Sequence, residues 1–136
     1  MLICGMGGEL ICDIIERGKE LLYGGAWLIL QPMTREVELR RYLCDGGYEI
    51  YDETLLEDAG RLYTVIAARY TGDKFKYSAE ELLLGRKNIE KRGELFYRLC
   101  ARKKLHTENL LKSDRYTGED VLLDETLSGY LREEGE

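Results

Sequence analysis

The first eleven residues constrain the fold of this chain more than any other stretch. An apolar run over residues 2–4 leads directly into Gly-Met-Gly-Gly at residues 5–8, and a helical pattern begins at Glu9. This order is typical of a short buried parallel strand, a tight turn and a helix N-terminus. In open α/β sheets, ligands bind at the carboxyl ends of such strands, and glycine lets the backbone approach them closely. Taken alone, three glycines in four residues more often mark a plain turn.

The chain then alternates between strand and helix patterns up to residue 72. A helix is predicted over Glu9–Leu22, and the continuous apolar run Ala26–Leu30 predicts a strand buried on both faces and central in the sheet. Thr34 is a suitable N-cap for a helix over 35–44. The last two strands, 48–56 and 62–70, are joined by a short turn and must pair antiparallel. The order β-α-β-α-β-β therefore predicts an α/β, Rossmann-like sheet that ends in an antiparallel hairpin.

Beyond residue 72 the sequence becomes helical and highly charged. Ser78 and Glu81 have the spacing of a capping box. Residues 86–115 hold ten Lys and Arg against four acidic residues, whereas 116–136 hold seven acidic residues against one Arg. We therefore expect three parts: a sheet domain over 1–72, a basic helical extension over 73–115, and a loosely ordered acidic tail over 116–136. A short helix near 122–131 is expected within the tail.

Composition excludes several classes of function. The net charge of −6 argues against a generally basic nucleic-acid binder, although it allows a local basic patch. The four cysteines form no CxxC pair and there is one histidine, so no metal site is expected, and the thiols should be reduced and packed. No signal peptide or membrane-length apolar run is visible, which predicts a cytoplasmic protein with no membrane partner.

Several motifs together resemble one family. Residues 3–11, residues 28–35, with Leu-Ile-Leu-Gln-Pro-Met-Thr-Arg, and residues 39–43 are similar to the bacterial tRNA (adenine-N1)-methyltransferases of the TrmK type. These are class I methyltransferases that depend on S-adenosylmethionine (SAM). The stretches 57–63 and 84–96 match in kind and order, so the resemblance covers about residues 2–112. The helical region after Gly72 resembles the coiled-coil-like C-terminal extension of this family. Arg86 stands where family members often have proline, which affects a local turn.

The resemblance implies that residues 2–4 form the fourth strand of the class I sheet. The glycine-rich SAM loop and the acidic residue that holds the ribose in this family have no counterpart here. We therefore expect the C-terminal part of a truncated enzyme, which would need the missing N-terminal half as a partner and would not bind SAM alone. When complete, the enzyme would transfer a methyl group from SAM to an adenine of tRNA. An open edge at residues 2–4 and an uncovered apolar face, with Leu28, Leu30 and Val65 or Ile66, would favour self-association.

The resemblance also suggests site residues, although no catalytic base. The wall between the methyl donor and the adenine would be lined by Gly5, Met6, Gly7 and Gly8. Gln31 and Pro32 would end the adjacent strand at the same edge of the sheet. Gly7 is expected to need a positive φ or space that a side chain would fill. Gln31 is expected either to bind a base edge or to cap the backbone. The expected tRNA contacts, each of which is alternatively a solvated surface residue, are Arg35, Arg86, Lys87, Lys91, Arg98, Arg102 and Lys103.

Two other functions remain open from the sequence. The chain could be a non-catalytic fragment that interacts with protein or RNA through its charged helical arm. It could also be a different nucleotide-binding α/β protein that uses residues 5–8 for phosphate. The sequence contains neither a Gly-x-Gly-x-x-Gly motif nor a Walker-type lysine, which counts against the phosphate-binding function.

Overall fold

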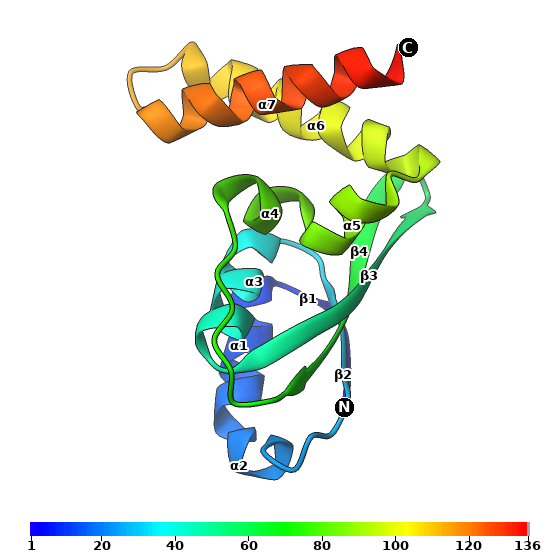
Figure 1. The fold of residues 1–136 in the computed structure, drawn as a ribbon, viewed down its shortest axis with the longest axis vertical. Helices are drawn as coiled ribbons and strands as arrows, with labels where there is room; N and C mark the ends of the chain where they lie inside the picture. The colour runs from blue at the N-terminus through cyan, green and yellow to red at the C-terminus, as the bar shows by residue number, and fades with distance from the viewer. Residues whose placement is uncertain (136) are drawn as a thin grey trace. The chain divides into compact units, whose positions relative to one another are not determined.

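The computed structural model describes residues 1–135 as two compact units that divide between Glu90 and Lys91. The first unit contains β1 (Leu2–Met6), α1 (Gly8–Arg17), α2 (Lys19–Leu22), β2 (Leu28–Pro32), α3 (Glu36–Asp45), β3 (Tyr48–Asp58), β4 (Arg61–Tyr70), α4 (Ala79–Leu84) and most of α5 (Arg86–Lys91) (Figure 1). The second unit contains α6 (Glu94–Leu111) and α7 (Gly118–Glu134). This division differs from the limits expected at residues 72 and 115.

The four strands form one mixed sheet in the order β1-β2-β4-β3. Strand β1 pairs parallel to β2, whereas β4 pairs antiparallel to both β2 and β3. The predicted fold class is confirmed, including the terminal hairpin. Strand β2 is central as expected, but only one of its two neighbours is parallel, because the second strand of the hairpin lies beside it.

Helices α1 and α3 cover one face of this sheet (Figure 1). The register places Ile3 opposite Leu30, and Leu30 opposite Ile66, so these three side chains point to the same face. They pack with the apolar sides of the two helices, which supply Ile11, Ile15, Leu39 and Leu43. All seven side chains are buried, and this layer is the core of the first unit.

The other face of the sheet carries the alternate residues. Leu2 is 70% exposed and Trp27 is 45% exposed. The guanidinium of Arg69 lies 5.0 Å from the centroid of the Trp27 ring and 5.1 Å from that of Tyr51. The expectation that Leu28, Leu30 and Val65 or Ile66 would lie on an uncovered face is therefore wrong for Leu28, Leu30 and Ile66, because strand alternation turns these side chains toward the helices. Val65 alternates with them and lies on the other face, where it is half-buried.

The four cysteines are free thiols, but they are not equally packed. Cys44 and Cys100 are buried and Cys12 is half-buried, whereas Cys4 is exposed beside the glycines of residues 5–8. Burial raises the pKa of Cys44 to about 11 and that of Cys100 to about 12. The expectation of packed thiols thus fails for Cys4, because its side chain points to the open sheet face.

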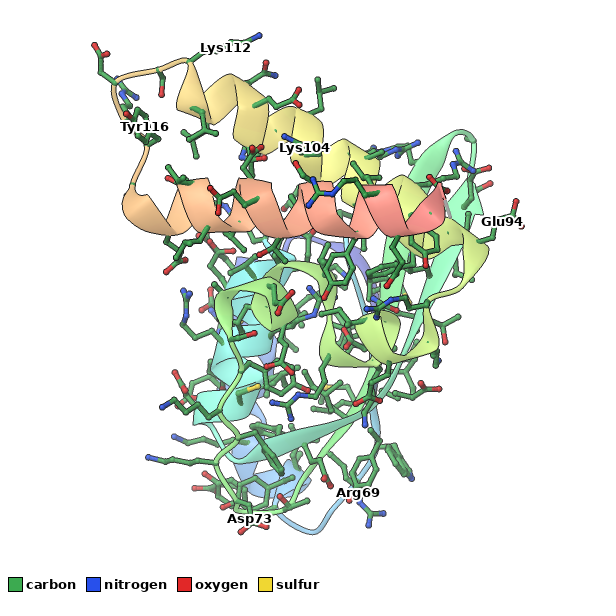
Figure 2. All side chains as sticks on the ribbon, turned by 45° about the horizontal axis from the view of Figure 1, so that its top comes forward. Arg69, Asp73, Glu94, Lys104, Lys112 and Tyr116 are labelled. Carbon is green, nitrogen blue, oxygen red and sulfur yellow. The ribbon has the colours of Figure 1, made fainter. Side chains whose placement is uncertain are left out.

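The second unit is a helical hairpin in which α6 and α7 pack along their length. Phe96 and Cys100 of α6 and Leu127 of α7 are buried. Lys104, labelled in Figure 2, donates to Asp124 at 2.8 Å, and Arg92 donates to Glu133 at 2.6 Å. The stretch expected to be loosely ordered thus forms a 17-residue helix, in which Asp124 pairs with Lys104 of α6 and Glu133 pairs with Arg92 just before α6. Residue 136 lies outside the described residues.

Among residues 1–135, no helix combines the length and the apolar character that crossing a membrane requires. In the same residues, no group of three or more His, Cys, Asp or Glu side chains could hold a metal ion.

Candidate functional site

The loops that follow β1 and β2 lie against each other at the carboxyl ends of these two parallel strands. The amide of Gly8 donates to the Thr34 carbonyl at 2.7 Å, and the amide of Met33 donates to the Met6 carbonyl at 2.8 Å. The strand register continues this contact, since Met6 pairs with Pro32. We call residues 5–8 and 31–35 together the rim. The structure thus brings together the six residues predicted for the donor and adenine pocket.

The three glycines of the rim have different physical roles. Gly5 has φ of +73° and open space around a Cβ position, so its backbone conformation is what favours glycine. Gly8 is buried, and a Cβ there would overlap the carbonyl oxygen of Arg35. Gly7 is extended at φ −63°, and a Cβ there would lie 3.1 Å from Thr34 Oγ1. The close approach of the two loops therefore depends most on Gly8.

Gln31, Pro32 and Met6 differ in what they present at the rim. Met6 is 37% exposed, Gln31 is half-buried and Pro32 is buried. Among the described residues, the Gln31 amide has no hydrogen-bond partner, so the backbone-capping alternative is not observed. The structure leaves this amide available to a ligand.

Arg35 begins α3 in an unexpected way. The N-cap is Arg35, in the left-handed conformation at φ 59°, and not Thr34 as the sequence predicted. Arg35 has a 60% exposed side chain, which lies 3.5 Å from a Glu38 oxygen and 3.9 Å from a Glu9 oxygen. The turn onto Gly8 accounts for the difference, because the Thr34 carbonyl is used by the Gly8 amide.

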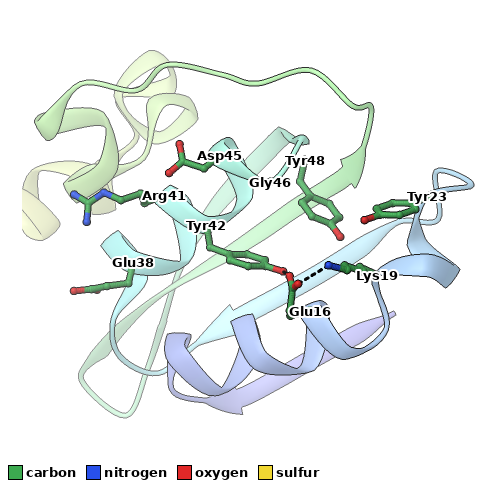
Figure 3. Close-up of a pocket in the computed structure, with 9 residues that line it drawn as sticks. All are labelled: Glu16, Lys19, Tyr23, Glu38, Arg41, Tyr42, Asp45, Gly46 and Tyr48. Carbon is green, nitrogen blue, oxygen red and sulfur yellow. Dashed lines mark hydrogen bonds and ion pairs between the residues drawn. The ribbon is translucent and has the colours of Figure 1, made fainter.

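A cavity lies away from the rim, beside the ends of α1, α2 and α3. This cavity of about 510 Å³ includes Glu16, Tyr42 and Tyr48 in its wall (Figure 3). Glu16 accepts hydrogen bonds from Lys19 at 2.6 Å and from Tyr42 at 2.5 Å. None of the site residues predicted from the sequence lines it.

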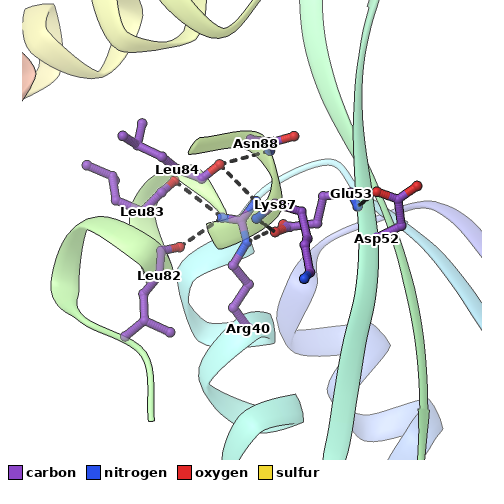
Figure 4. A network of polar contacts seen from close by, with 8 residues as sticks. All are labelled: Arg40, Asp52, Glu53, Leu82, Leu83, Leu84, Lys87 and Asn88. Carbon is purple, nitrogen blue, oxygen red and sulfur yellow. Dashed lines mark hydrogen bonds and ion pairs between the residues drawn. The ribbon is translucent and has the colours of Figure 1, made fainter. Parts of the chain in front are cut away.

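Arg40 and Glu53 form a fully buried ion pair that the sequence did not reveal (Figure 4). Arg40 Nε donates to Glu53 Oε2 at 2.8 Å, and the same guanidinium donates to the carbonyl of Leu82 at 2.8 Å. Gly85 has φ of +94°, and a Cβ there would lie 2.5 Å from the Glu53 carboxylate. The pair joins α3, β3 and the α4–α5 turn, and both residues resemble ordinary surface charges in the sequence.

Two of the predicted tRNA-contacting residues also hold the α4–α5 segment. Arg86 donates to Glu81 at 2.5 Å and to the Lys76 carbonyl at 2.7 Å, and lies 4.0 Å from the centroid of the Tyr77 ring. The backbone amide of Lys87 donates to Glu53 at 3.2 Å. Contact of Arg86 and Lys87 with RNA stays a prediction.

The remaining predicted RNA contacts lie in the second unit. Arg98 and Arg102 are exposed on α6, four residues apart and hence on one helix face, and Lys103 beside them is half-buried. Lys91 is exposed at the start of this unit. The arrangement provides a cationic strip along α6.

The geometry first defines a class of protein. Parallel strands that lead to a glycine-containing rim, with an antiparallel hairpin at one edge, form a Rossmann-like α/β methyltransferase sheet. A family model described as TrmK, tRNA (adenine(22)-N(1))-methyltransferase, matches residues 1–125. The chain therefore belongs to this family, and the resemblance derived from its motifs is confirmed.

Individual relatives agree with this assignment. The tRNA (adenine(22)-N(1))-methyltransferase of Bacillus subtilis is 44% identical over 72 residues, which are 53% of this chain and 30% of that protein. The crystal structure of Streptococcus pneumoniae Sp1610, a putative tRNA (m1A22) methyltransferase in complex with SAM, superposes with a TM-score of 0.81 at 30% identity. That match covers 96% of this chain and 58% of the other. The structure of B. subtilis TrmK superposes with a TM-score of 0.72 at 27% identity, covering 96% and 59% of the two chains.

The extent of these matches bears on function. The chain spans less than two fifths of the length of the curated relatives and about three fifths of the solved chains. Activity, substrate and cofactor are properties of the relatives as whole proteins.

Proposed function

We propose that this chain forms one part of a SAM-dependent tRNA adenine-N1 methyltransferase, and that its rim lies between the methyl donor and the target adenine. The observation that carries the proposal is the mutual locking of the two loops by the Gly8–Thr34 and Met33–Met6 hydrogen bonds. This places glycine backbone and the Gln31 amide at the carboxyl ends of two parallel strands, where α/β sheets bind ligands.

The rim residues suit a reaction that depends on positioning. SAM, when bound, supplies an electrophilic methyl group, and adenine N1 carries its own lone pair. The enzyme therefore needs to align the adenine and exclude water more than it needs a strong base. We assign alignment of a base edge to Gln31, and close backbone approach to Gly5 and Gly8. The rim fits the wall of a methyl-donor site, but the chain lacks the family's glycine-rich loop and ribose carboxylate, so we propose that it does not hold SAM alone.

Two measurements test this proposal. Isothermal titration of the chain with SAM should give no measurable binding, and micromolar binding would contradict the claim that SAM needs residues outside this chain. The second measurement uses a chimera. In it, the part of the S. pneumoniae relative that precedes its matching region is fused to the N-terminus of residues 1–136. The chimera should methylate tRNA adenine at N1. Binding of tRNA without methylation would favour the non-catalytic interaction fragment.

Variants of the chimera separate the rim from the fold. Gly8→Val should reduce single-turnover methylation at least about a hundredfold, because a displacement of about 1 Å at the reacting centre has effects of that order. Gly24→Ala is the matched control, since a Cβ there meets nothing within 4 Å. If Gly8→Val only lowers the melting temperature while the folded fraction methylates normally, the glycines are a structural turn.

We also propose that the cationic strip of α6 contacts the phosphate backbone of tRNA. Replacing Arg98, Arg102 and Lys103 together with Glu should abolish tRNA binding by the chimera at low salt. Binding of tRNA by the chimera without these substitutions should weaken as the salt concentration rises, because phosphate contacts release counterions. Arg17, Arg61 and Lys74, changed to Glu together, alter the net charge equally and serve as control. Equal losses in both triple variants would assign the effect to net charge and contradict a specific strip.

A further inference from the structure

The cavity at the ends of α1, α2 and α3 is separate from the rim. Gly8 begins α1 and Glu16 lies near its end, so the cavity and the rim are about 12 Å apart along the helix. The cavity volume of about 510 Å³ lies within the range of small-molecule sites. Its lining includes the tyrosines Tyr23, Tyr42 and Tyr48, with Glu16 and Lys19 beside them and Asp45 at the end of α3 (Figure 3).

Tyr48 supplies the observation that points to a ligand. Its side chain is 2% exposed, and its hydroxyl has no hydrogen-bond partner among residues 1–135. The ring is held by Tyr42 and Tyr70, with centroids 6.4 Å and 5.5 Å away. Figure 3 shows the hydroxyl directed toward Lys19 and Tyr23, on the cavity side. Leaving a buried hydroxyl without a partner is unfavourable, so a polar group that satisfies it gains binding energy.

The surroundings of this hydroxyl favour a cation. Three carboxylates, Glu16, Glu38 and Asp45, outnumber the two basic side chains in the wall. The C-terminal ends of α1 and α3 add partial negative charge, and α3 has no basic residue in its last turn. Tyrosine faces attract organic cations in addition. Burial raises the pKa of both Tyr42 and Tyr48, so their hydroxyls remain neutral dipoles at physiological pH.

The ion pair between Lys19 and Glu16 indicates the kind of cation that fits beside Glu16. The primary ammonium of Lys19 donates to Glu16 at 2.6 Å at the mouth of the cavity. This exposed ion pair is weak, because solvent screens it. An ammonium group from a ligand can replace Lys19 beside Glu16 and also reach the Tyr48 hydroxyl.

We propose that this cavity binds a linear aliphatic di- or polyamine. One terminal ammonium donates to Tyr48 Oη and pairs with Glu16, the alkyl chain packs on the Tyr23 and Tyr42 rings, and a second ammonium pairs with Asp45. The site is independent of the rim, and the proposal needs neither SAM nor tRNA.

Calorimetric titration of the full chain with spermidine at physiological ionic strength tests the proposal. We expect saturable one-to-one binding. Tyr48→Phe keeps the ring and should weaken binding about fivefold, the equivalent of one hydrogen bond. Asp45→Asn should weaken it comparably. Lys19→Met should strengthen it, because it removes the intramolecular competitor, an effect that loss of fold would not produce.

Controls distinguish this site from general attraction to an acidic protein. Tyr51→Phe, on the exposed sheet face, should leave spermidine affinity unchanged. Titration with MgCl₂ at matched ionic strength should give no saturable heat that differs between the native chain and the Tyr48→Phe variant. Absence of saturable spermidine binding, or equal affinity in the native chain and the folded Tyr48→Phe and Lys19→Met variants, would overturn the proposal.

Discussion

At the scale of single residues, the rim shows why glycines that look alike in sequence are not equivalent. Gly7 was expected to need a positive φ or space that a side chain would fill. Its backbone is extended, but a Cβ there would make a tight contact of 3.1 Å with Thr34 Oγ1. Gly5 is the residue with a positive φ, and Gly8 is the residue at which a Cβ would overlap backbone atoms. The contact arises because the loop after β2 folds onto the start of α1, a contact between segments about 25 residues apart in the chain.

The buried Arg40–Glu53 pair predicts a strong effect of one charge. Glu53→Gln should lower the free energy of unfolding of the first unit by about 3–5 kcal/mol, because Arg40 would keep its charge without a partner. Urea unfolding followed by the fluorescence of Trp27, the one tryptophan of the sequence, measures this. Glu49→Gln, on the same strand and not buried, should change it by less than about 0.5 kcal/mol. Similar losses for the two variants would show that the ion pair adds little.

At the scale of elements, the second unit shows how charge complementarity orders a segment. Helix α7 has a weak apolar seam in sequence, but Thr117 and Asp120 form a capping box. Two of its acidic side chains also pair with Lys104 of α6 and with Arg92 just before α6. These partners lie 20 and 41 residues away along the chain, so composition alone suggested a loose acidic tail.

These pairs predict that the hairpin loosens in acid. Hydrogen bonds from Arg92 and Lys104 lower the pKa of Glu133 and Asp124 below their ordinary values of 4.5 and 3.8. A carboxyl group whose pKa is lower in the folded than in the unfolded state stabilises the fold at pH values above its ordinary pKa. This stabilisation is lost as the pH falls through the lowered pKa. NMR chemical shifts of residues 118–134 should therefore show fraying of α7 below about pH 4.

A variant pair checks the cause of this acid sensitivity. Glu133→Gln should reduce the change seen between neutral and acidic pH, because it removes one of the titrating partners. Glu125→Gln, exposed on the same helix, should leave the change as it is. Equal acid profiles in the native chain and Glu133→Gln would assign the fraying to other groups.

At the scale of the whole molecule, the sheet leaves the β1 edge and one face exposed. Strand β1 is at the sheet edge, and Leu2 and Trp27 on the open face are 70% and 45% exposed. Exposed strand edges and apolar patches promote association. We therefore expect concentration-dependent self-association of the purified chain in sedimentation velocity.

Leu2→Lys should reduce that association, because a charge on the edge strand opposes pairing with another chain. Leu21→Lys makes the same change at a residue that is 83% exposed on α2 and should have no effect. A monomer at all concentrations, or an equal response of the two variants, would contradict association through the β1 edge.

The sequence by itself determined the element order, the fold class and the family of this protein. Apolar periodicity and turn residues are local, and the Gly-Met-Gly-Gly and Leu-Gln-Pro motifs are contiguous, so each can be recognised without knowing the fold. Only the tertiary structure decided which glycine supports the rim, which sheet face is covered, and that Arg40 and Glu53 are buried together. It also left the Tyr48 hydroxyl, beside a cavity, without a hydrogen-bond partner among residues 1–135. These features depend on residues distant in the chain meeting in space, and a one-dimensional pattern does not record how close they come.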